Sequence, residues 1–96
     1  MIRSFRDQAT EDVFHGRETR HARRLPKALW PIIRRKLDML GAAHVLGDLR
    51  QPPGNRLERL KGTRPPCYSI RVNDQYRITF RFEADQAMEV TCEDYH

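Results

Sequence analysis

The sequence predicts an α+β fold in which two N-terminal helices pack on a small, mainly antiparallel β-sheet. Apolar residues recur with helical spacing in residues 25–43, and apolar and polar residues alternate from residue 68 onward. The 96 residues are enough for one domain with a modest core and too few for two. Any functional site must therefore be built on one small fold.

The first quarter of the chain predicts a short strand and then a short helix. Ile2 and Phe5 suggest the strand, and residues 7–15 suggest a helix that ends at Gly16. Residues 17–24 are so rich in arginine that we expect an exposed connection.

The main helix is predicted from residue 25 onward. Its apolar residues fall on one helical face: Leu29, Ile32, Ile33, Leu37, Leu40 and Ala43. Pro26 suits a first turn, whereas Pro31 lacks a backbone donor that a helix interior needs. We therefore expect a bend at Pro31 or a helix that begins only near residue 28.

The second half of the chain predicts strands. Residues 51–55 break any helix, residues 56–60 suggest a strand that ends before Gly62, and residues 68–82 alternate as a β-hairpin with a turn at residues 73–75. The hairpin has one apolar face and one face that carries arginines.

A last strand should follow a break at residues 83–86. We expect Met88, Val90 and Cys92 to share its apolar face. This phase would place Asp94 and His96 on one face and Tyr95 on the other.

The charge distribution favours a phosphate-containing partner. Eighteen basic residues oppose thirteen acidic ones, and fifteen of the basic residues are arginine, which binds phosphate with two parallel donors. Residues 17–36 hold eight bases and one acid, whereas residues 83–96 hold five acids and no lysine or arginine. The first region suits nucleic acid, and the second offers carboxylates.

Other classes of protein are not predicted. Cys67 and Cys92 lack the spacing of a zinc site, so we expect reduced strand residues and neither metal nor cofactor. No signal peptide opens the chain, and no apolar stretch approaches the roughly 20 residues of a membrane helix. We expect a cytoplasmic protein.

The last three residues are a candidate site for proton transfer. Asp94, Tyr95 and His96 combine an acid, a phenol and the side chain that titrates near neutral pH. A solvated tail on an edge strand explains these residues equally well when they are considered alone.

The polar face of the hairpin is a second candidate site. Arg71, Arg77 and Arg81 lie at even offsets within their strands, so they can follow one phosphate backbone, although a solvated sheet face is the alternative. Lys61 before Gly62 is a third candidate, but such a pair more often forms a turn.

These motifs together resemble the HigB-type toxins of the RelE superfamily. The resemblance rests on Leu60-Lys61-Gly62, on the hairpin of residues 68–80 and on the terminal residues 93–96, and it extends over nearly the whole chain. It implies a single RelE-like toxin domain over residues 1–96. It also implies a ribosome-dependent endoribonuclease that cuts mRNA in the ribosomal A site.

The catalytic residues that the resemblance implies are Lys61, Arg77, Asp94, Tyr95 and His96. Some relatives have a histidine three residues before the lysine, where this chain has Glu58. The implied reaction is attack by the RNA 2′-hydroxyl on the adjacent phosphorus, for which no metal is required. His96 and Asp94 would move protons, and Arg77 and Lys61 would stabilise the charged transition state.

The remaining bases are candidates for contact with RNA and the ribosome, with a solvated surface as the alternative for each: Arg20, Arg23, Arg24, Arg34, Arg35, Lys36, Arg71 and Arg81. The implied partners are the 70S ribosome with its mRNA, a helix-turn-helix antitoxin of the HigA type, and operator DNA through that antitoxin. Two other functions remain open: a ParE-type toxin that acts on a topoisomerase, which would not need the terminal residues, and a plain nucleic-acid-binding module.

Overall fold

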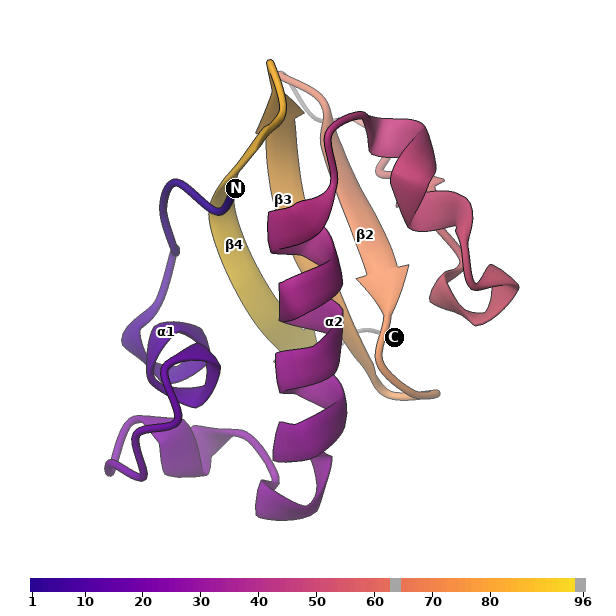
Figure 1. Cartoon of the computed structure of the whole chain (residues 1–96). Helices are drawn as coiled ribbons and strands as arrows, with labels where there is room; N and C mark the ends of the chain where they lie inside the picture. Colours follow the sequence, from indigo (N-terminus) through magenta and orange to yellow (C-terminus); the bar gives the residue numbers. More distant parts are fainter. Residues whose placement is uncertain (63–64, 95–96) are drawn as a thin grey trace.

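A computed structural model of the chain describes residues 1–62 and 65–94. Within this part, two α-helices and four strands form, in the order α1 (Gln8–Phe14), α2 (Trp30–Ala42), β1 (Glu58–Arg59), β2 (Cys67–Arg71), β3 (Tyr76–Glu83) and β4 (Gln86–Asp94). The strands make one antiparallel sheet in the order β1-β2-β3-β4. Both helices lie on one face of this sheet (Figure 1). The α+β prediction is confirmed.

The helices begin and end where the sequence predicted. Asp7 caps α1, since its carboxylate accepts the Thr10 N–H at 3.2 Å, and Gly16 follows the helix with a φ of 74°. A 3₁₀ turn at Lys27–Leu29 precedes α2, so Pro31 lies in the first helical turn, where no intrahelical donor is required. The expected late start of the main helix is therefore confirmed.

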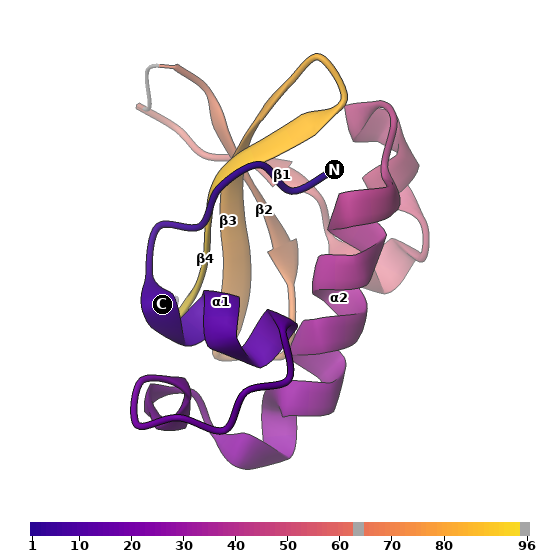
Figure 2. The same cartoon turned by 60° about the vertical axis from the view of Figure 1, so that its left-hand side comes forward.

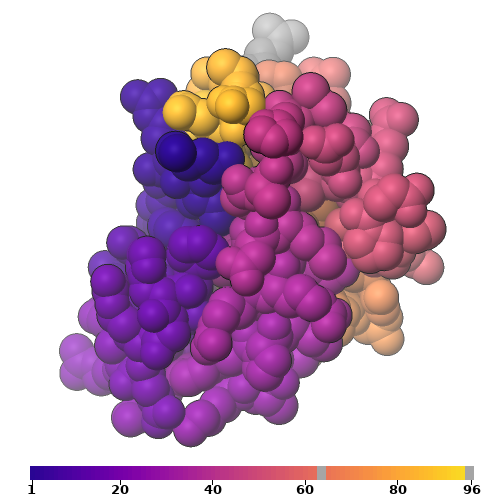
Figure 3. Space-filling model, viewed as in Figure 1, coloured from indigo at the N-terminus to yellow at the C-terminus, as the bar shows by residue number. Residues whose placement is uncertain are grey.

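The core lies between the helices and one face of the sheet. Ile33, Leu37 and Leu40 of α2 are fully buried in one cluster with apolar residues of the sheet such as Ile70 and Ile78. Viewed from the helical side, α1, the segment that follows it and α2 form a continuous surface over this core (Figure 3). No helix of the described residues is long and apolar enough to cross a membrane.

The predicted hairpin has the expected register. Ile70 pairs with Ile78 on the face that the helices cover, and Arg71 pairs with Arg77 on the other face. The Asn73 side chain stabilises the turn, because its oxygen accepts the N–H groups of Gln75 and Tyr76 at 2.9 and 2.7 Å. The described part of the chain has no helix on the second face (Figure 2).

The predicted phase of the last strand is wrong for Met88. Thr79 pairs with Thr91 but Arg81 pairs with Met88, so β4 contains one extra residue between these pairs. Glu89 has a φ of 52° at this bulge. The extra residue moves Met88 to the face of Arg81, while Val90 and Cys92 stay in the core.

Three connecting segments also differ from the predictions. Residues 1–6 run along β4 with two isolated parallel bridges, from Ile2 to Ala87 and from Phe5 to Val90, instead of forming a regular strand. In the basic connection, Ala22 is buried within a 3₁₀ turn. Between α2 and the sheet, 3₁₀ turns form at Leu46–Arg50 and Pro53–Asn55, and the strand expected over 56–60 is limited to β1.

Candidate active site

Arg77 lies on the helix-free face of the sheet, near the start of β3. Its side chain is only 9% exposed, because the neighbouring strand and the segment before β1 enclose it. Nε donates to Ser69 Oγ at 2.9 Å, and Nη2 donates to the Arg56 carbonyl at 2.6 Å. The arginine is therefore held in one orientation by two different segments.

The partners of Arg77 among these contacts are neutral oxygens. A weaker contact to the Ser69 carbonyl at 3.4 Å is of the same kind. Neutral acceptors satisfy the donors of a guanidinium without cancelling its charge. These contacts fix the orientation of the guanidinium on the face of the sheet where Glu93 of β4 lies opposite Arg77.

The other two hairpin arginines are engaged differently. Arg71 pairs with Asp74 in the turn, and Arg81 pairs with Glu83 at 3.1 Å and with Glu89 at 3.2 Å. Hydrogen bonding to Glu89, opposed by burial and supported by Glu83, raises the pKa of Arg81. Arg71 and Arg81 would therefore contact a phosphate backbone only in addition to these carboxylates.

Lys61 lies in the exposed turn after β1. It lines a hollow of about 270 Å³ with Arg59, Leu60 and Gly62. The Leu60 N–H donates to the Cys67 carbonyl at 2.8 Å, so Lys61 lies near the first residue of β2. Arg77 instead pairs with Arg71, the last residue of that strand. Four residues of strand span roughly 13 Å. The Arg77 guanidinium turns back to Ser69 and shortens this separation.

Asp94 is the last residue of β4, opposite Tyr76. Its Oδ2 accepts a hydrogen bond from Gln75 Nε2 at 2.9 Å. Alternation along β4 places Glu93 on the face of Arg77 and directs Asp94 the other way. Tyr95 and His96, which complete the predicted site, lie outside the described residues.

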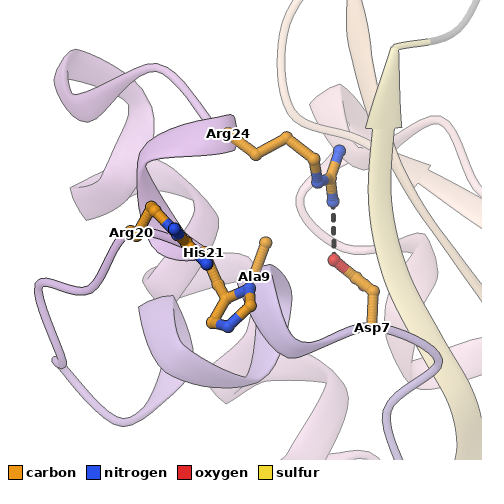
Figure 4. A pocket seen from close by; sticks show the side chains of 5 residues that line it. All are labelled: Asp7, Ala9, Arg20, His21 and Arg24. Carbon is orange, nitrogen blue, oxygen red and sulfur yellow. Dashed lines mark hydrogen bonds and ion pairs between the residues drawn. The ribbon is translucent and has the colours of Figure 1, made fainter.

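The basic segment before α2 forms a hollow of about 330 Å³ beside α1 (Figure 4). Arg24 points to Asp7 across the hollow, and Arg20, His21 and Ala9 complete its lining. Arg24 Nη2 lies 2.6 Å from Asp7 Oδ2 and 3.2 Å from the Cys92 carbonyl. Arg24 thus joins the connecting segment to both α1 and β4, whereas Arg20 is exposed.

Asp7 is the centre of a polar clamp that the sequence analysis missed. We define the clamp as Asp7, Thr10, Arg24, Thr91 and Cys92. Thr91 Oγ1 donates to Asp7 Oδ1 at 2.7 Å, and the Cys92 N–H donates to Thr10 Oγ1 at 2.9 Å. Burial raises the pKa of Asp7, but hydrogen bonds from Thr91, Thr10 and Arg24 outweigh it, so the net pKa is lowered. An aspartate at the first residue of the predicted helix was the available signal.

The three bases of α2 have different environments. Arg35 is exposed, and Arg34 Nε donates to the Val13 carbonyl at 3.2 Å near the end of α1. The prediction that Lys36 belongs to an exposed docking surface is wrong, because this residue is 7% exposed and its Nζ donates to Asn55 Oδ1. Helical periodicity explains this placement, since Lys36 follows Ile33 by three residues on the buried side of α2.

The described residues offer little other chemistry. Burial raises the pKa of the Cys92 thiol to about 12, so this cysteine is not a nucleophile. Among residues 1–62 and 65–94, no group of three histidine, cysteine, aspartate or glutamate side chains is arranged to hold a metal ion.

Comparison with known proteins gives a family match over almost the whole chain. The model of the family described as RelE-like toxin of type II toxin-antitoxin system HigB matches residues 3–96. Toxin HigB-1 of Vibrio cholerae is 43% identical over 82 residues, which cover 85% of this chain and 84% of that protein. An uncharacterized protein of Haemophilus influenzae is 43% identical over 63 residues, which cover 66% of this chain and 62% of that protein.

Proposed function

This chain belongs to the HigB family of RelE-like toxins from type II toxin-antitoxin systems, and we propose that it is an endoribonuclease that cuts mRNA on the ribosome. Membership of such a system implies an antitoxin partner. The endoribonuclease activity, the ribosomal target and the identity of the antitoxin are our proposals.

The observation that carries the nuclease proposal is the state of Arg77. This arginine is buried, oriented by two segments and bound through Nε and Nη2 to neutral oxygens. Cleavage of a phosphodiester by the RNA itself builds negative charge on the non-bridging oxygens of a five-coordinate phosphorus. An oriented cation in a partly water-excluded site is the most effective way to stabilise that charge.

The reaction we propose needs only the RNA and protein side chains. The 2′-oxygen forms a bond to the adjacent phosphorus, and the bond from phosphorus to the 5′-oxygen of the next nucleotide breaks. The 2′-hydroxyl proton passes to a base, and the leaving 5′-oxygen takes a proton from an acid. The products are a 2′,3′-cyclic phosphate and a 5′-hydroxyl.

The terminal residues supply the proton transfers in this proposal. His96 acts as base or acid, and Asp94 orients it or shares the work. Tyr95 offers a phenol proton or a surface on which an unstacked base can lie. Lys61 assists Arg77 from the turn after β1, where its ammonium group is exposed to a passing RNA backbone.

Exposed bases provide the docking surface for ribosomal RNA. Arg20, Arg23 and Arg35 are exposed, and we assign them to contacts with phosphates that carry no sequence information. Lys36 is omitted because it is buried. Arg24, Arg34, Arg71 and Arg81 already have partners within the protein, so each of them would bind RNA only in addition to that contact.

The antitoxin we propose is a helix-turn-helix protein of the HigA type, encoded beside this chain. The basic surface would attract an acidic partner and orient it. The toxin lacks a recognition helix of its own among the described elements, so the antitoxin would supply the base contacts at the operator. Co-expressing the neighbouring gene and purifying through a tag on this chain should recover both proteins. Recovery of this chain alone, with undiminished toxicity, would exclude the proposed partner.

Expression in bacteria followed by mapping of mRNA 5′ ends tests the nuclease proposal. New ends within translated codons should appear for the wild type and disappear for His96→Ala and Arg77→Ala proteins that remain folded. Full toxicity of a folded His96→Ala protein would contradict the role of the terminal histidine. Growth arrest with a DNA-damage response and no new mRNA ends would point to a topoisomerase instead.

A further inference from the structure

Asn55 occupies the end of the 3₁₀ turn Pro53–Asn55 and is completely buried. Its Nδ2 donates to the carbonyls of Leu49 and Gln51 at 3.1 and 3.3 Å, and its Oδ1 accepts from Lys36 Nζ. The amide therefore holds the segment before β1 together through Nδ2 and fastens it onto α2 through Oδ1. This segment cannot shift without breaking several buried hydrogen bonds.

Arg56, which follows Asn55, links this fixed segment to Arg77. Arg56 has a left-handed backbone, with φ and ψ of 45° and 57°, which residues with a Cβ rarely adopt. Its N–H donates to the Pro53 carbonyl at 3.1 Å, and its own carbonyl accepts Arg77 Nη2 at 2.6 Å. The orientation of the Arg56 peptide thus determines where one arm of the guanidinium lies.

Lys36 anchors the other end of this chain of contacts, in a position unfavourable for a cation. It is 7% exposed, and its hydrogen-bond acceptor is an uncharged amide. Burial lowers the pKa of Lys36, and the positive charges of Arg35 and Arg71 lower it further. The Lys36 ammonium group therefore depends on its contact with Asn55 as its hydrogen-bond partner inside the protein.

We propose that Lys36 and Asn55 are positioning residues for Arg77, which they hold through the Arg56 carbonyl in the orientation needed for phosphodiester cleavage. This inference rests on the proposed nuclease function for its catalytic consequence. The contacts run from Lys36 Nζ to Asn55 Oδ1, along the backbone to the Arg56 carbonyl, and on to Arg77 Nη2. They connect α2, on the covered face of the sheet, with the helix-free face.

The test replaces Lys36 with methionine, which has a similar length and no charge. Lys27→Met is the matched control, because Lys27 is exposed and its side-chain partners among the described residues are Glu18, at 3.0 Å, and the face of Trp30. Two readouts are compared. The first is the NMR signal of the Arg77 Nε–H group, which reports its bond to Ser69. The second is single-turnover cleavage of mRNA on programmed ribosomes at saturating toxin.

Lys36→Met should shift or broaden the Arg77 signal and lower the cleavage rate about tenfold, because small misplacement of a catalytic group is costly. Ribosome affinity should stay constant, and Lys27→Met should change neither readout. In an Arg77→Lys background, Lys36→Met should have no further effect on rate, because it acts through the guanidinium. If Lys36→Met does not fold, Lys36→Gln, which keeps an N–H donor on a shorter side chain, carries the same test.

An unchanged Arg77 signal, or a wild-type cleavage rate, in a folded Lys36 variant would overturn the proposal. An equal loss of rate in both Arg77 backgrounds would do the same, because it would show a general effect of Lys36 on the fold. The wild-type protein could also cut no mRNA while Lys36→Met still shifts the Arg77 signal. This result would overturn the nuclease function and leave the structural link between Lys36 and Arg77 in place.

Discussion

Arg24 and Arg77 are both arginines that donate to a backbone carbonyl, yet their surroundings differ. Arg24 bonds to the Cys92 carbonyl and pairs with the carboxylate of Asp7 at 2.6 Å. Arg77 bonds to the Arg56 carbonyl and to the hydroxyl of Ser69. The first arginine is half-exposed and the second is buried.

From this difference we predict that Arg24 supports the fold and that Arg77 has a role in function. A carboxylate at hydrogen-bond distance neutralises a guanidinium and leaves it little attraction for an external phosphate. The hydroxyl and carbonyl oxygens that accept from Arg77 Nε and Nη2 orient its guanidinium and carry no charge of their own. Arg24 is therefore expected to support the end of β4, and Arg77 is expected to act on the substrate.

Arg77→Lys is the substitution with the largest expected effect. Lysine keeps the charge but lacks the planar fork through which Arg77 donates from Nε to Ser69 Oγ and from Nη2 to the Arg56 carbonyl. We expect single-turnover mRNA cleavage to fall about 100-fold or more, the usual effect of losing one transition-state donor. Arg3→Lys, at an exposed site, is the control. Near wild-type cleavage by Arg77→Lys would show that a positive charge at this position suffices. The hydrogen bonds of Arg77 to Ser69 and to the Arg56 carbonyl would then have no catalytic role.

A double charge reversal at Arg20 and Arg23 should have the next largest effect. These arginines are exposed, and in contrast to Arg24 neither makes a side-chain hydrogen bond or ion pair to the described residues. Replacing both with glutamate should weaken co-sedimentation with ribosomes about tenfold and flatten its salt dependence, without moving the mRNA cut sites. Arg3→Glu with Arg6→Glu makes the same change in net charge elsewhere. If that pair has an equal effect, the contribution comes from net charge and not from a docking site.

Periodicity in the sequence was enough to predict most of the fold. The alternation around Ile70 and Ile78 gave the correct hairpin register, and Pro31 marked the late start of α2. The bulge at Glu89 was not predictable, because its residue type does not require a positive φ. At this bulge β4 lies between residues 1–6 on one side and β3 on the other, an arrangement that only the tertiary fold supplies.

The candidate site was predictable to a smaller extent. Arg77 followed from its place in the hairpin, but its partners come from residues 56 and 69, whose approach depends on the tertiary fold. Arg24 and Lys36 were grouped with the exposed bases because composition does not distinguish a buried or paired cation from a solvated one. The partners that set these two residues apart from the solvated bases are distant in the sequence. Asp7 lies seventeen positions before Arg24, and Asn55 lies nineteen positions after Lys36.

Arg24→Ala should mainly affect stability. It removes the hydrogen bond to Cys92 and leaves Asp7 without its cation. Because the side chain is 49% exposed, we expect a loss of only about 1 kcal/mol in the free energy of unfolding. Urea unfolding measures this loss, with Arg23→Ala as the exposed control. Arg24→Ala could instead leave stability unchanged and weaken ribosome binding as strongly as the Arg20→Glu, Arg23→Glu double variant. Arg24 would then contact the ribosome, and its proposed role in supporting the fold would be wrong.

The smallest expected effect concerns the acid partner of Arg24 and depends on pH. The folded-state pKa of Asp7 is lowered, so its carboxylate stabilises the fold fully above its unfolded value of about 3.9, and this contribution disappears as the pH falls through the lower folded value. Asp7→Asn should therefore destabilise the protein by up to about 1 kcal/mol near pH 6, and this loss should shrink as the pH falls toward 3 and below. Asp38→Asn, at an exposed site, should show no such convergence with the wild type. The difference in the free energy of unfolding between Asp7→Asn and wild type could instead stay constant across this range. The clamp would then depend on the shape of the Asp7 side chain, and its negative charge would not be what sets Arg24 apart from Arg77.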